Sequence, residues 1–303
     1  MSSQLKGNYE LNQCVIYKLK SKRKLKKLLN LSENSNLKIY FNDDYFSCFD
    51  LMQEDGSARN IQTPINELQQ IHIRLANFFK YVKTPDYLHS GKKKHSIVTN
   101  AKAHIDSSKP TLTIDIAKFF PSTKREKIFN FFYKKMHQSA DVADILSRLV
   151  CYNNHVPTGS SISMLIAFWA NKEMFDELYK LCEANNIIMT VYVDDISFTG
   201  NGVGKLFLKK VTEIIERYGL NIKKEKVKFF KANSPKTITG VIVKNNRIYA
   251  RNEHYKKLRV MESAYKITKV EDVIEKGIMQ KAYNGQLAFL VQIHPQLRNK
   301  MVF

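Results

Sequence analysis

The pattern of apolar and polar positions predicts short strands interleaved with helices. Apolar runs bounded by turn residues predict strands at 38–41, 45–49, 111–116, 187–193, 196–199, 237–243 and 247–250. Apolar residues at helical spacing predict helices over 64–79, 141–150, 164–182 and 203–218. Residues 254–303 are expected to be helical and basic. Such a mixture is typical of an α+β or α/β chain, here with an antiparallel sheet backed by helices.

Turn and capping residues indicate where several of these elements begin and end. Asp141 can cap the helix that starts beside it, because a carboxylate accepts hydrogen bonds from free backbone N–H groups. Gly219 follows the 203–218 helix and suits its C-terminal turn. Asn245-Asn246 suits a tight turn between the last two predicted strands.

The composition is that of a folded protein without a membrane span. Of the 303 residues, 44% are hydrophobic, which suffices for one large domain or two moderate ones. No apolar run approaches the ~18 residues that a membrane span needs. The polar N-terminus lacks the apolar core of a signal peptide. We therefore expect a cytoplasmic protein.

The net charge of the chain indicates a polyanionic partner. Lys and Arg number 49 against 28 Asp and Glu, which gives +21. Phosphates neutralised by such a surface release condensed counterions. The many aromatic residues (18 Phe and 15 Tyr) and the lack of a lipidation motif favour nucleic acid over a membrane. Residues 18–27 carry seven basic side chains and form either a solvated helix face or an arm that contacts phosphates.

The cysteines do not indicate a zinc site or a disulfide framework. They lie far apart, and no two form a C-x-x-C pair. Buried thiols in a reducing compartment are expected, at Cys14, Cys48, Cys151 and Cys182.

Two adjacent aspartates, Asp194 and Asp195, interrupt the apolar strand pair at 187–199. Like charges at a hairpin tip repel each other, and burying either one without a partner is unfavourable. A divalent cation removes this penalty, and Mg²⁺ prefers carboxylate oxygens. The pair is therefore a candidate metal site, although an Asp-Asp dipeptide alone is also an ordinary turn.

A third carboxylate, Asp115, is the lone acid of the apolar 111–116 strand. If that strand lies beside the 187–199 hairpin, three carboxylates converge. Two Mg²⁺ ions about 3.5–4 Å apart could then activate a 3′-hydroxyl and stabilise a leaving pyrophosphate. Taken alone, an aspartate at a strand end is often only a cap or a surface residue.

These segments together resemble the palm of reverse transcriptases, with the YVDD hairpin ending at Asp195 and an upstream Asp-Ile-x-x-Phe-Phe that starts at Asp115. The resemblance implies an α+β, right-hand polymerase with fingers, palm and a small helical thumb. It also implies that Asp115 and Asp194 are the principal metal ligands and that Asp195 completes the acidic cluster.

The resemblance extends from about Arg59 to about residue 255 and implies a nucleotide site. Arg59 is expected to hold the triphosphate, since a guanidinium presents a fork of donors to phosphate. Gly159 lies in Pro-Thr-Gly-Ser, where the family usually has Pro-Gln-Gly, and would allow close approach of the nucleotide. Phe120 takes the position of the steric gate against a ribose 2′-OH, or is a core phenylalanine. Ile116 is also expected to contact the dNTP.

A further motif, Gly-Leu-Asn-Ile-Lys-Lys-Glu-Lys, ends at Lys226. Lys226 is the candidate general acid, because an amine with a pKa near ~10.4 is protonated at neutral pH and can protonate pyrophosphate. Lys223 and Lys224 are alternatives for that role, or bind backbone phosphates.

Two shorter elements resemble those of retron reverse transcriptases. Asn100-Ala-Lys-Ala-His104 matches their Asn-Ala-x-x-His, and Ile-Thr239-Gly240 stands where they carry Val-Thr-Gly. These residues are expected to contact RNA, with a partly buried histidine as the alternative for His104. The expected thumb offers phosphate contacts and one ring that can stack on a base, through Tyr255, Lys256, Lys257 and Arg259.

The expected organisation is a basic N-terminal part of the fingers (1–58), the catalytic fingers and palm (59–243) and an RNA-binding thumb (244–303). The resemblance implies copying of a cognate non-coding RNA from dNTPs, priming from an RNA 2′-OH, and phage defence beside a separate effector protein. The short stretch after residue 254 argues against group II intron relatives. Alternatives are another defence-type reverse transcriptase and an inactive RNA-binding scaffold.

Overall fold

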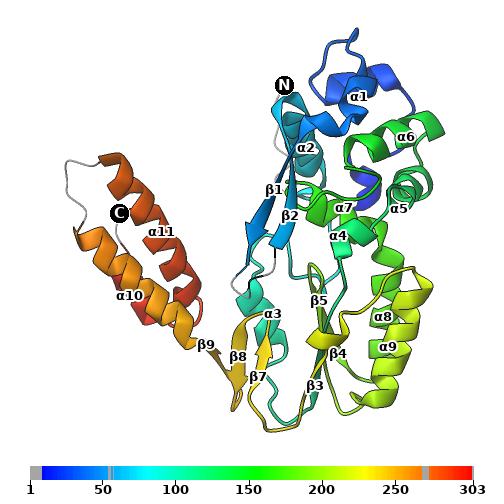
Figure 1. The fold of residues 1–303 in the computed structure, drawn as a ribbon. Coiled ribbons are helices and arrows are strands. Elements are labelled where there is room, and N and C mark those ends of the chain that lie inside the picture. The colour runs from blue at the N-terminus through cyan, green and yellow to red at the C-terminus, as the bar shows by residue number, and fades with distance from the viewer. Residues whose placement is uncertain (1–8, 54–55, 57, 268–272, 302–303) are drawn as a thin grey trace.

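The computed structural model describes residues 9–53, 56, 58–267 and 273–301. Figure 1 shows a main body that holds the two-stranded and four-stranded sheets and most helices, and a pair of C-terminal helices that stands apart from it. The α-helices are α1 (Lys22–Leu28), α2 (Asn66–Phe79), α3 (Ile97–Ala103), α4 (Phe119–Ser122), α5 (Arg125–Asn130), α6 (Ala140–Leu149), α7 (Ser163–Ala170), α8 (Lys172–Ala184), α9 (Lys205–Arg217), α10 (Asn252–Ile267) and α11 (Val273–Val291).

Short 3₁₀ and π turns complete the helical elements. They are η1 (Leu11–Gln13), η2 (Leu37–Phe41), η3 (Asp43–Tyr45), the π-helical η4 (Phe131–Lys135), η5 (Lys224–Lys226) and η6 (Pro295–Lys300). The strand predicted at 38–41 is wrong, because η2 occupies that segment and buries Leu37 and Tyr40 at helical rather than alternating spacing. The next predicted strand is present and longer, as β1 (Phe46–Met52), which pairs with β2 (Ala58–Pro64).

The sheet at the centre of the body has four strands in the order β4-β5-β3-β6. They are β3 (Thr111–Asp115), β4 (Ile188–Tyr192), β5 (Asp195–Thr199) and β6 (Lys228–Phe230). Every pairing is antiparallel, as predicted. Figure 1 shows α8 and α9 together on one side of this sheet.

A three-stranded sheet, β7-β8-β9, links the body to the C-terminal helices. Its strands are β7 (Lys236–Ile238), β8 (Val241–Lys244) and β9 (Arg247–Ala250). The single strand predicted at 237–243 is therefore two strands, since Thr239 and Gly240 both have positive φ and turn the chain between them. The expected boundary between 243 and 244 also falls inside this sheet.

Two further boundaries and the burial of one cysteine differ from the predictions. The helix predicted over 164–182 is broken at Asn171, whose side chain accepts from Lys127 and donates to Thr123 instead of continuing a helix face. Ser139, not Asp141, is the residue before α6, and the Asp141 carboxylate accepts from Val142 N within the first turn. Cys48 is exposed on β1, whereas the other three cysteines are buried as predicted.

In the part of the chain that the structure describes, the buried apolar side chains form three clusters. The largest extends from the N-terminal segment through α2 and the four-stranded sheet to α9, and includes Leu25 of α1. The second lies between α3 and the β7–β9 sheet, and the third lies between α10 and α11. The basic segment 18–27 is thus no free arm, because Leu25 is fully buried and two of its cations pair with Glu33 and Asp141.

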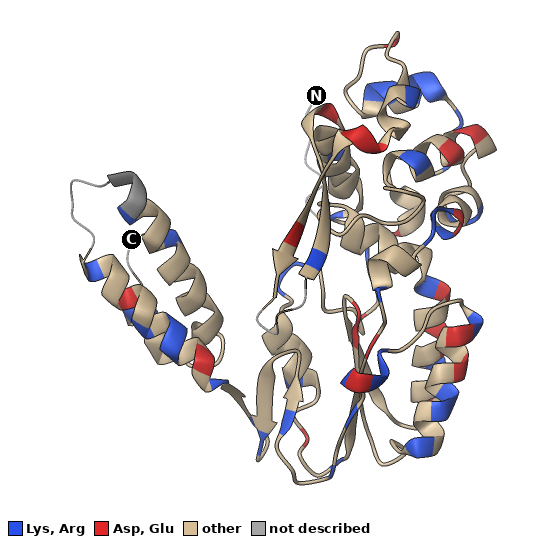
Figure 2. Ribbon diagram, viewed as in Figure 1, with Lys and Arg blue, Asp and Glu red and all other residues tan. Residues whose placement is uncertain are grey.

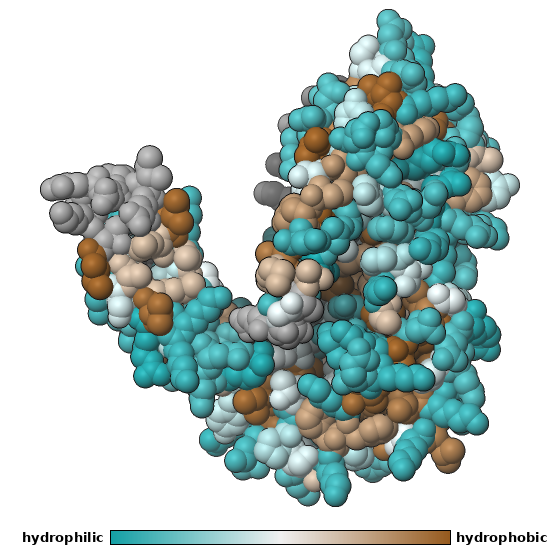
Figure 3. Space-filling view, in the orientation of Figure 1, coloured by the Kyte–Doolittle hydropathy of each residue, from teal (hydrophilic) through white to brown (hydrophobic). Residues whose placement is uncertain are grey.

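The surface agrees with a partner that enters between the two parts. Figure 3 shows a hollow between the C-terminal helices and the body. Figure 2 shows basic residues on α1 and along the C-terminal helices. None of the helices in the described part of the chain is both long and apolar enough to cross a membrane.

Candidate active site

The strand register brings the three aspartates together. β3 ends at Asp115, β5 begins at Asp195, and these two residues lie opposite each other in the sheet. Asp194 lies in the two-residue turn between β4 and β5, and its carbonyl accepts a 3.0 Å hydrogen bond from the N–H of Ile116. The predicted adjacency of the 111–116 strand and the hairpin is therefore present.

The turn that carries Asp194 has an unfavourable backbone conformation. Val193 has φ of 60°, where a β-branched side chain is rarely found and where strain of about 1–3 kcal/mol is typical. Its N–H donates to Ser90 Oγ at 3.0 Å, so a neighbouring loop helps to hold the turn. The acid-bearing tip is thus fixed from outside as well as by its own strands.

Burial and mutual repulsion make it hard for these carboxylates to ionise together. Burial, and then the charge of Asp115, raises the pKa of Asp194 above its ordinary value. Burial, followed by the charges of Asp194 and Asp115, raises the pKa of Asp195 to about 7. A site of this kind favours any cation that can neutralise it.

Lys226 supplies one such cation. Its Nζ lies 2.7 Å from Asp115 Oδ2, and the Asp115 side chain is only 9% exposed. The hydrogen bond to Asp115 raises the pKa of the Lys226 amine, which therefore stays protonated at neutral pH. The lysine predicted as general acid thus touches the acidic cluster, while Lys223 pairs with Glu225 at 3.8 Å.

The chemistry of the aspartates suits a divalent ion, although their side chains are not arranged around a common metal position. Among the described residues, no three His, Cys, Asp or Glu side chains are arranged as a metal cluster. The donor set nevertheless consists of carboxylates that repel one another, and Mg²⁺ prefers oxygen ligands. The residues present therefore fit a hard cation.

The residues expected around the nucleotide differ in their access to it. Arg59 is exposed on β2. Burial and the charge of Asp115 raise the pKa of Asp194, and the positive charge of Arg59 partly opposes that rise, so Arg59 acts on the acidic cluster. Phe120 is half-buried beside the core residue Phe119, with 5.7 Å between the ring centroids. Ile116 is 0% exposed, which argues against the predicted contact of its side chain with a dNTP.

Gly159 allows its loop to lie close to β2, whereas the sequence analysis expected it to allow close approach of the nucleotide. Its N–H donates to the Gln62 carbonyl at 3.0 Å. A Cβ there would collide with Thr63 Oγ1 and would lie 2.9 Å from the Gln62 carbonyl. Thr158 fastens the same loop, since its hydroxyl donates to the Asn60 carbonyl at 2.9 Å. The loop and β2, which carries Arg59, therefore form one unit.

A residue that the sequence analysis missed, His72 of α2, also holds this loop. The side chain is fully buried, with Nε2 2.6 Å from the Leu149 carbonyl and Nδ1 2.6 Å from Ser160 Oγ. A carbonyl only accepts, so Nε2 carries the proton and Ser160 donates to Nδ1. Burial lowers the pKa of His72 to about 4. The one signal in the sequence is a histidine on the apolar face of the predicted 64–79 helix.

The two retron-like elements lie against each other. Asn100 Nδ2 donates to Thr239 Oγ1 at 3.2 Å, and both Asn100 and His104 are 0% exposed. The two ring nitrogens of His104 form hydrogen bonds with the hydroxyl groups of Thr199 and Thr190. The alternative of a buried histidine is therefore the one that fits, and burial argues against direct RNA contact by Asn100 or His104. Thr239 and Gly240 remain partly exposed.

The candidate residues of the C-terminal helices line a surface cavity of about 550 Å³. Tyr255, Lys256 and Arg259 line it together with Lys300 and Glu262 of the same helical region. Lys257 is exposed but is not part of the lining. Two of the three predicted phosphate contacts, Lys256 and Arg259, thus share one groove with the ring of Tyr255.

Residues 53–243 match the family model of reverse transcriptase (RNA-dependent DNA polymerase). The retron Ec86 reverse transcriptase of Escherichia coli is 24% identical over 232 residues, 75% of this chain and 72% of that protein. The retron Se72 enzyme of Salmonella heidelberg is 26% identical over 205 residues, 64% of this chain and 51% of that protein. The retron Ec83 enzyme of E. coli is 24% identical over 216 residues, 65% and 69% respectively.

Two solved telomerases share the fold. Apo telomerase from Candida tropicalis superposes with a TM-score of 0.52 at 10% identity, over 80% of this chain and 52% of that chain. Telomerase from Candida albicans, in complex with a TWJ fragment of telomeric RNA, gives 0.50 at 9% identity, over 84% and 56%. This chain thus spans little more than half of either telomerase.

An antiparallel sheet with acids at one strand end and one hairpin tip, flanked by helices and faced by a separate helical pair, defines a nucleic acid polymerase of the right-hand type. The chain belongs to the reverse transcriptase family, because the family model matches more than half of it. It is an RNA-directed DNA polymerase of the retron type. We call the four-stranded sheet the palm sheet and α10–α11 the thumb.

Proposed function

We propose that this enzyme copies part of a cognate structured non-coding RNA into single-stranded DNA, the branched RNA–DNA product of a retron. The observation that carries the proposal is the register that sets Asp115 beside Asp195 next to the hairpin tip with Asp194. The kind of template and product, including priming from an RNA 2′-OH, is proposed from the resemblance to retron reverse transcriptases. Anti-phage defence beside a separate effector protein follows from the same resemblance.

The three aspartates are proposed to hold two Mg²⁺ ions, which would supply charge neutralisation for the primer hydroxyl and the leaving pyrophosphate. Around them the chain positions the substrates. Arg59 binds the triphosphate of the dNTP, and the ring of Phe120 limits the space beside the sugar. The primer oxygen forms a bond to the α-phosphorus while the bond to pyrophosphate breaks.

Lys226 is proposed to transfer its proton to the departing pyrophosphate. Its pairing with Asp115 has two consequences for this role. The raised pKa keeps the amine charged until the step occurs, and the ammonium must exchange Asp115 for a phosphate oxygen. With 52% of its side chain exposed, Lys226 has room for that movement.

RNA binding is assigned to the thumb groove and the hollow beside it. The groove offers Lys256, Arg259 and Lys300 for phosphates, and Tyr255 for stacking on a base. Because the groove lies on the thumb and the acids lie on the palm sheet, one RNA can be gripped at one place and copied at another.

The test is DNA synthesis by purified protein with its cognate RNA, Mg²⁺ and dNTPs, compared between the parent and Asp194→Asn. The variant should lose DNA synthesis but still bind the RNA, because Asp194 lies in the turn between β4 and β5 and not in the thumb groove. Asp86→Asn is the matched control, since that carboxylate is fully exposed and pairs with Lys92 at 3.5 Å. Parent-level synthesis by Asp194→Asn would disprove the metal assignment.

Sequencing the nucleic acid that copurifies with the parent tests the retron part separately. A single structured RNA joined to complementary DNA supports the proposal. DNA made without any cognate RNA would instead identify another class of defence reverse transcriptase.

A further inference from the structure

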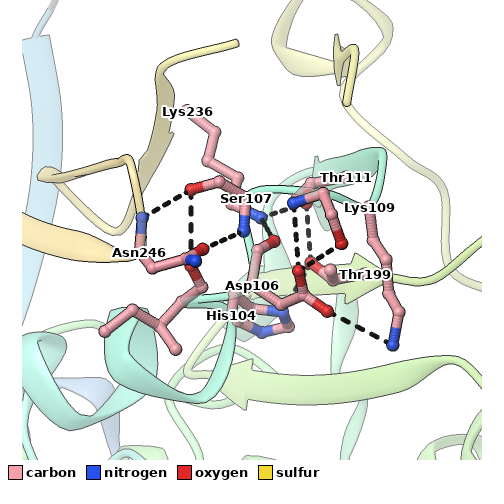
Figure 4. A network of polar contacts seen from close by, with 10 residues as sticks. His104, Asp106, Ser107, Lys109, Thr111, Thr199, Lys236 and Asn246 are labelled. Atoms are coloured by element: carbon pink, nitrogen blue, oxygen red, sulfur yellow. Dashed lines mark hydrogen bonds and ion pairs between the residues drawn. The ribbon is translucent and has the colours of Figure 1, made fainter. Parts of the chain in front are cut away.

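A chain of buried polar side chains runs through the far end of the palm sheet. Figure 4 shows most of it. All members are at most 2% exposed, namely Lys236, Thr111, Thr199, His104 and Thr190. Buried polar groups are stable only when hydrogen-bonded, so the order of donors and acceptors along this chain is constrained.

The constraint begins at the lysine. Lys236 Nζ donates to the Asp106 carbonyl at 2.7 Å and to Thr111 Oγ1 at 3.1 Å, and an ammonium cannot accept. Thr111 Oγ1 lies 2.7 Å from Thr199 Oγ1. If Thr199 donated its hydroxyl proton to Thr111, then Thr111 would accept from both Lys236 and Thr199, and its own hydroxyl proton would have no acceptor among these side chains. The arrangement that pairs every proton is donation from Thr111 to Thr199.

The same direction of donation continues from Thr199 to His104. Thr199 Oγ1 lies 2.9 Å from His104 Nδ1, and His104 Nε2 lies 2.7 Å from Thr190 Oγ1. Because Thr199 donates to Nδ1, the single imidazole proton belongs on Nε2 and is donated to Thr190. A doubly protonated ring would break the order, and burial, with the charges of Lys236 and His89, lowers the pKa of His104 to about 3.

The threonines lie on the three strands that lead to the acids. Thr111 and Thr199 pair with each other at the ends of β3 and β5, and Thr190 is the middle residue of β4. Each lies four residues along the chain from a catalytic-site aspartate, as in the pairs Thr111 and Asp115, Thr190 and Asp194, and Thr199 and Asp195. The hydrogen bonds therefore join β3 and β5 at their ends opposite the acids, roughly 13 Å away at ~3.3 Å per residue, and join both strands to the middle of β4. Short strands transmit a shift at one end to the other.

The lysine end of the chain belongs to the sheet that leads into the thumb. Lys236 is the first residue of β7, and β9 runs directly into α10. A second pair of bonds makes the same connection, since Ser107 N–H donates to Asn246 Oδ1 at 2.8 Å and Asn246 N–H donates to Ser107 Oγ at 2.9 Å. Both are visible in Figure 4.

We propose that Lys236 and His104 are positioning residues for polymerisation, which hold the acid-bearing strands and the thumb-bearing sheet in one arrangement through a one-way chain of hydrogen bonds. Neither side chain touches the substrate. Their effect is on the alignment of Asp115, Asp194 and Asp195 relative to a primer that the thumb holds.

The first test is steady-state primer extension by Lys236→Met on a plain RNA template with a DNA primer. We expect kcat to fall by about 10- to 100-fold, as for small misplacements of catalytic groups. KM for the dNTP should stay within about twofold, because Arg59 and the Gly159 loop belong to another part of the fold. Thr199→Val breaks the same chain with little change of shape and should reproduce this split if Lys236→Met fails to fold.

Lys109→Met is the matched control. Lys109 pairs with Asp106 at 3.3 Å in the same loop. Its side chain is 39% exposed and takes no part in the chain of hydrogen bonds from Lys236 to Thr190. It should keep the parent kcat. The proposal would be overturned if Lys109→Met lowered kcat as much as Lys236→Met does. It would also be overturned if Lys236→Met and Thr199→Val raised only the KM for the dNTP.

The second test reads the direction of the chain in the parent protein. With ¹⁵N-labelled histidine, His104 should give the neutral Nε2–H tautomer throughout about pH 5–8. Lys236→Met removes the donor that fixes the direction and should give a mixture of tautomers. A ring protonated on Nδ1 in the parent, or one that titrates in this range, would contradict a one-way chain.

Discussion

At the scale of single residues, the acidic cluster is held at the expense of stability in the absence of metal. Asp195 illustrates this, because its environment raises its pKa to about 7 while an unfolded aspartate ionises near ~3.9. The folded state therefore binds more protons than the unfolded state between these values. Stability should then decrease as the pH rises through this window.

Asp195→Asn should make the metal-free protein more stable at pH 8, by about 1–3 kcal/mol, because the carboxamide carries no charge to bury. At pH 4 both proteins are neutral at this position and the difference should be small. Thermal unfolding in a chelator at the two pH values measures the effect. Asp86→Asn, at an exposed site, should show no such gain at pH 8. A gain of equal size at both pH values would contradict the argument.

Lys226→Met should lower kcat by about 10²–10⁴-fold, the range expected for loss of a general acid. It also removes the counter-ion of Asp115, so the KM for the dNTP is measured alongside kcat to separate the two effects. Lys224→Met, two residues away in η5, is the control and should retain most of the activity. If both variants lose activity equally, the assignment of the proton to Lys226 is wrong.

At the scale of elements, the sequence predicted the regular strands and helices. It did not predict features that depend on contacts between residues distant in sequence. β3, β4 and β5 were predicted because apolar runs between turn residues report burial directly. The break at Asn171 was not, because its cause is the side chains of Lys127 and Thr123, which are distant in sequence. The turn at Thr239-Gly240 was missed because apolar residues continue on both sides of it.

The candidate site shows the same division. The three acids were found because charge inside apolar strands is rare and needs an explanation. His104 and Asn100 were expected to reach RNA, but their burial depends on contacts with β4, β5 and Thr239 that no short motif displays. For the same reason, no pattern in the sequence indicates that Gly159 faces β2.

Gly159→Ala tests the unit formed by the Gly159 loop and β2. The new methyl group would lie 2.9 Å from a backbone carbonyl, which cannot move without displacing β2. We expect a loss of about 1–3 kcal/mol in unfolding free energy, typical of overpacking, and a higher KM for the dNTP because Arg59 moves with β2. Thermal unfolding and primer extension measure the two effects.

Gly204→Ala is the control for this substitution. Nothing lies within 4 Å of a Cβ at Gly204, and its backbone is extended. Equal losses in the two variants would show that the close approach at Gly159 has no special effect.

At the scale of the whole molecule, the binding surface and the catalytic strands belong to different parts of the fold. The acids lie on a sheet within the largest apolar cluster, while the basic groove is on helices with a cluster of their own. Because the groove and the acids lie on different elements, substitutions in the groove should weaken RNA binding without changing the catalytic residues.

The double variant Lys256→Gln/Arg259→Gln should reduce the salt dependence of RNA binding. Each cation that no longer neutralises a phosphate lowers the slope of log K against log salt by about 0.7–0.9, so a decrease of about 1.4–1.8 is expected. Affinity for a short hairpin RNA, measured over a series of KCl concentrations, gives the slope. Lys205→Gln/Lys209→Gln on α9 should leave it unchanged, and an equal decrease there would indicate general rather than local attraction.

The separation of the apolar clusters has a consequence for how the molecule comes apart. The clusters around β7–β9 and between α10 and α11 share Phe289 and Ile293, whereas neither side chain packs against the largest cluster. We therefore expect β7–β9 and α10–α11 to form a cooperative unit, which contacts the remainder through Val98 and Ala101 of α3 and through polar bonds such as those of Lys236. Heating should produce two calorimetric transitions, and an RNA that spans both units should merge them into one, which makes the nucleic acid a structural member of the working enzyme.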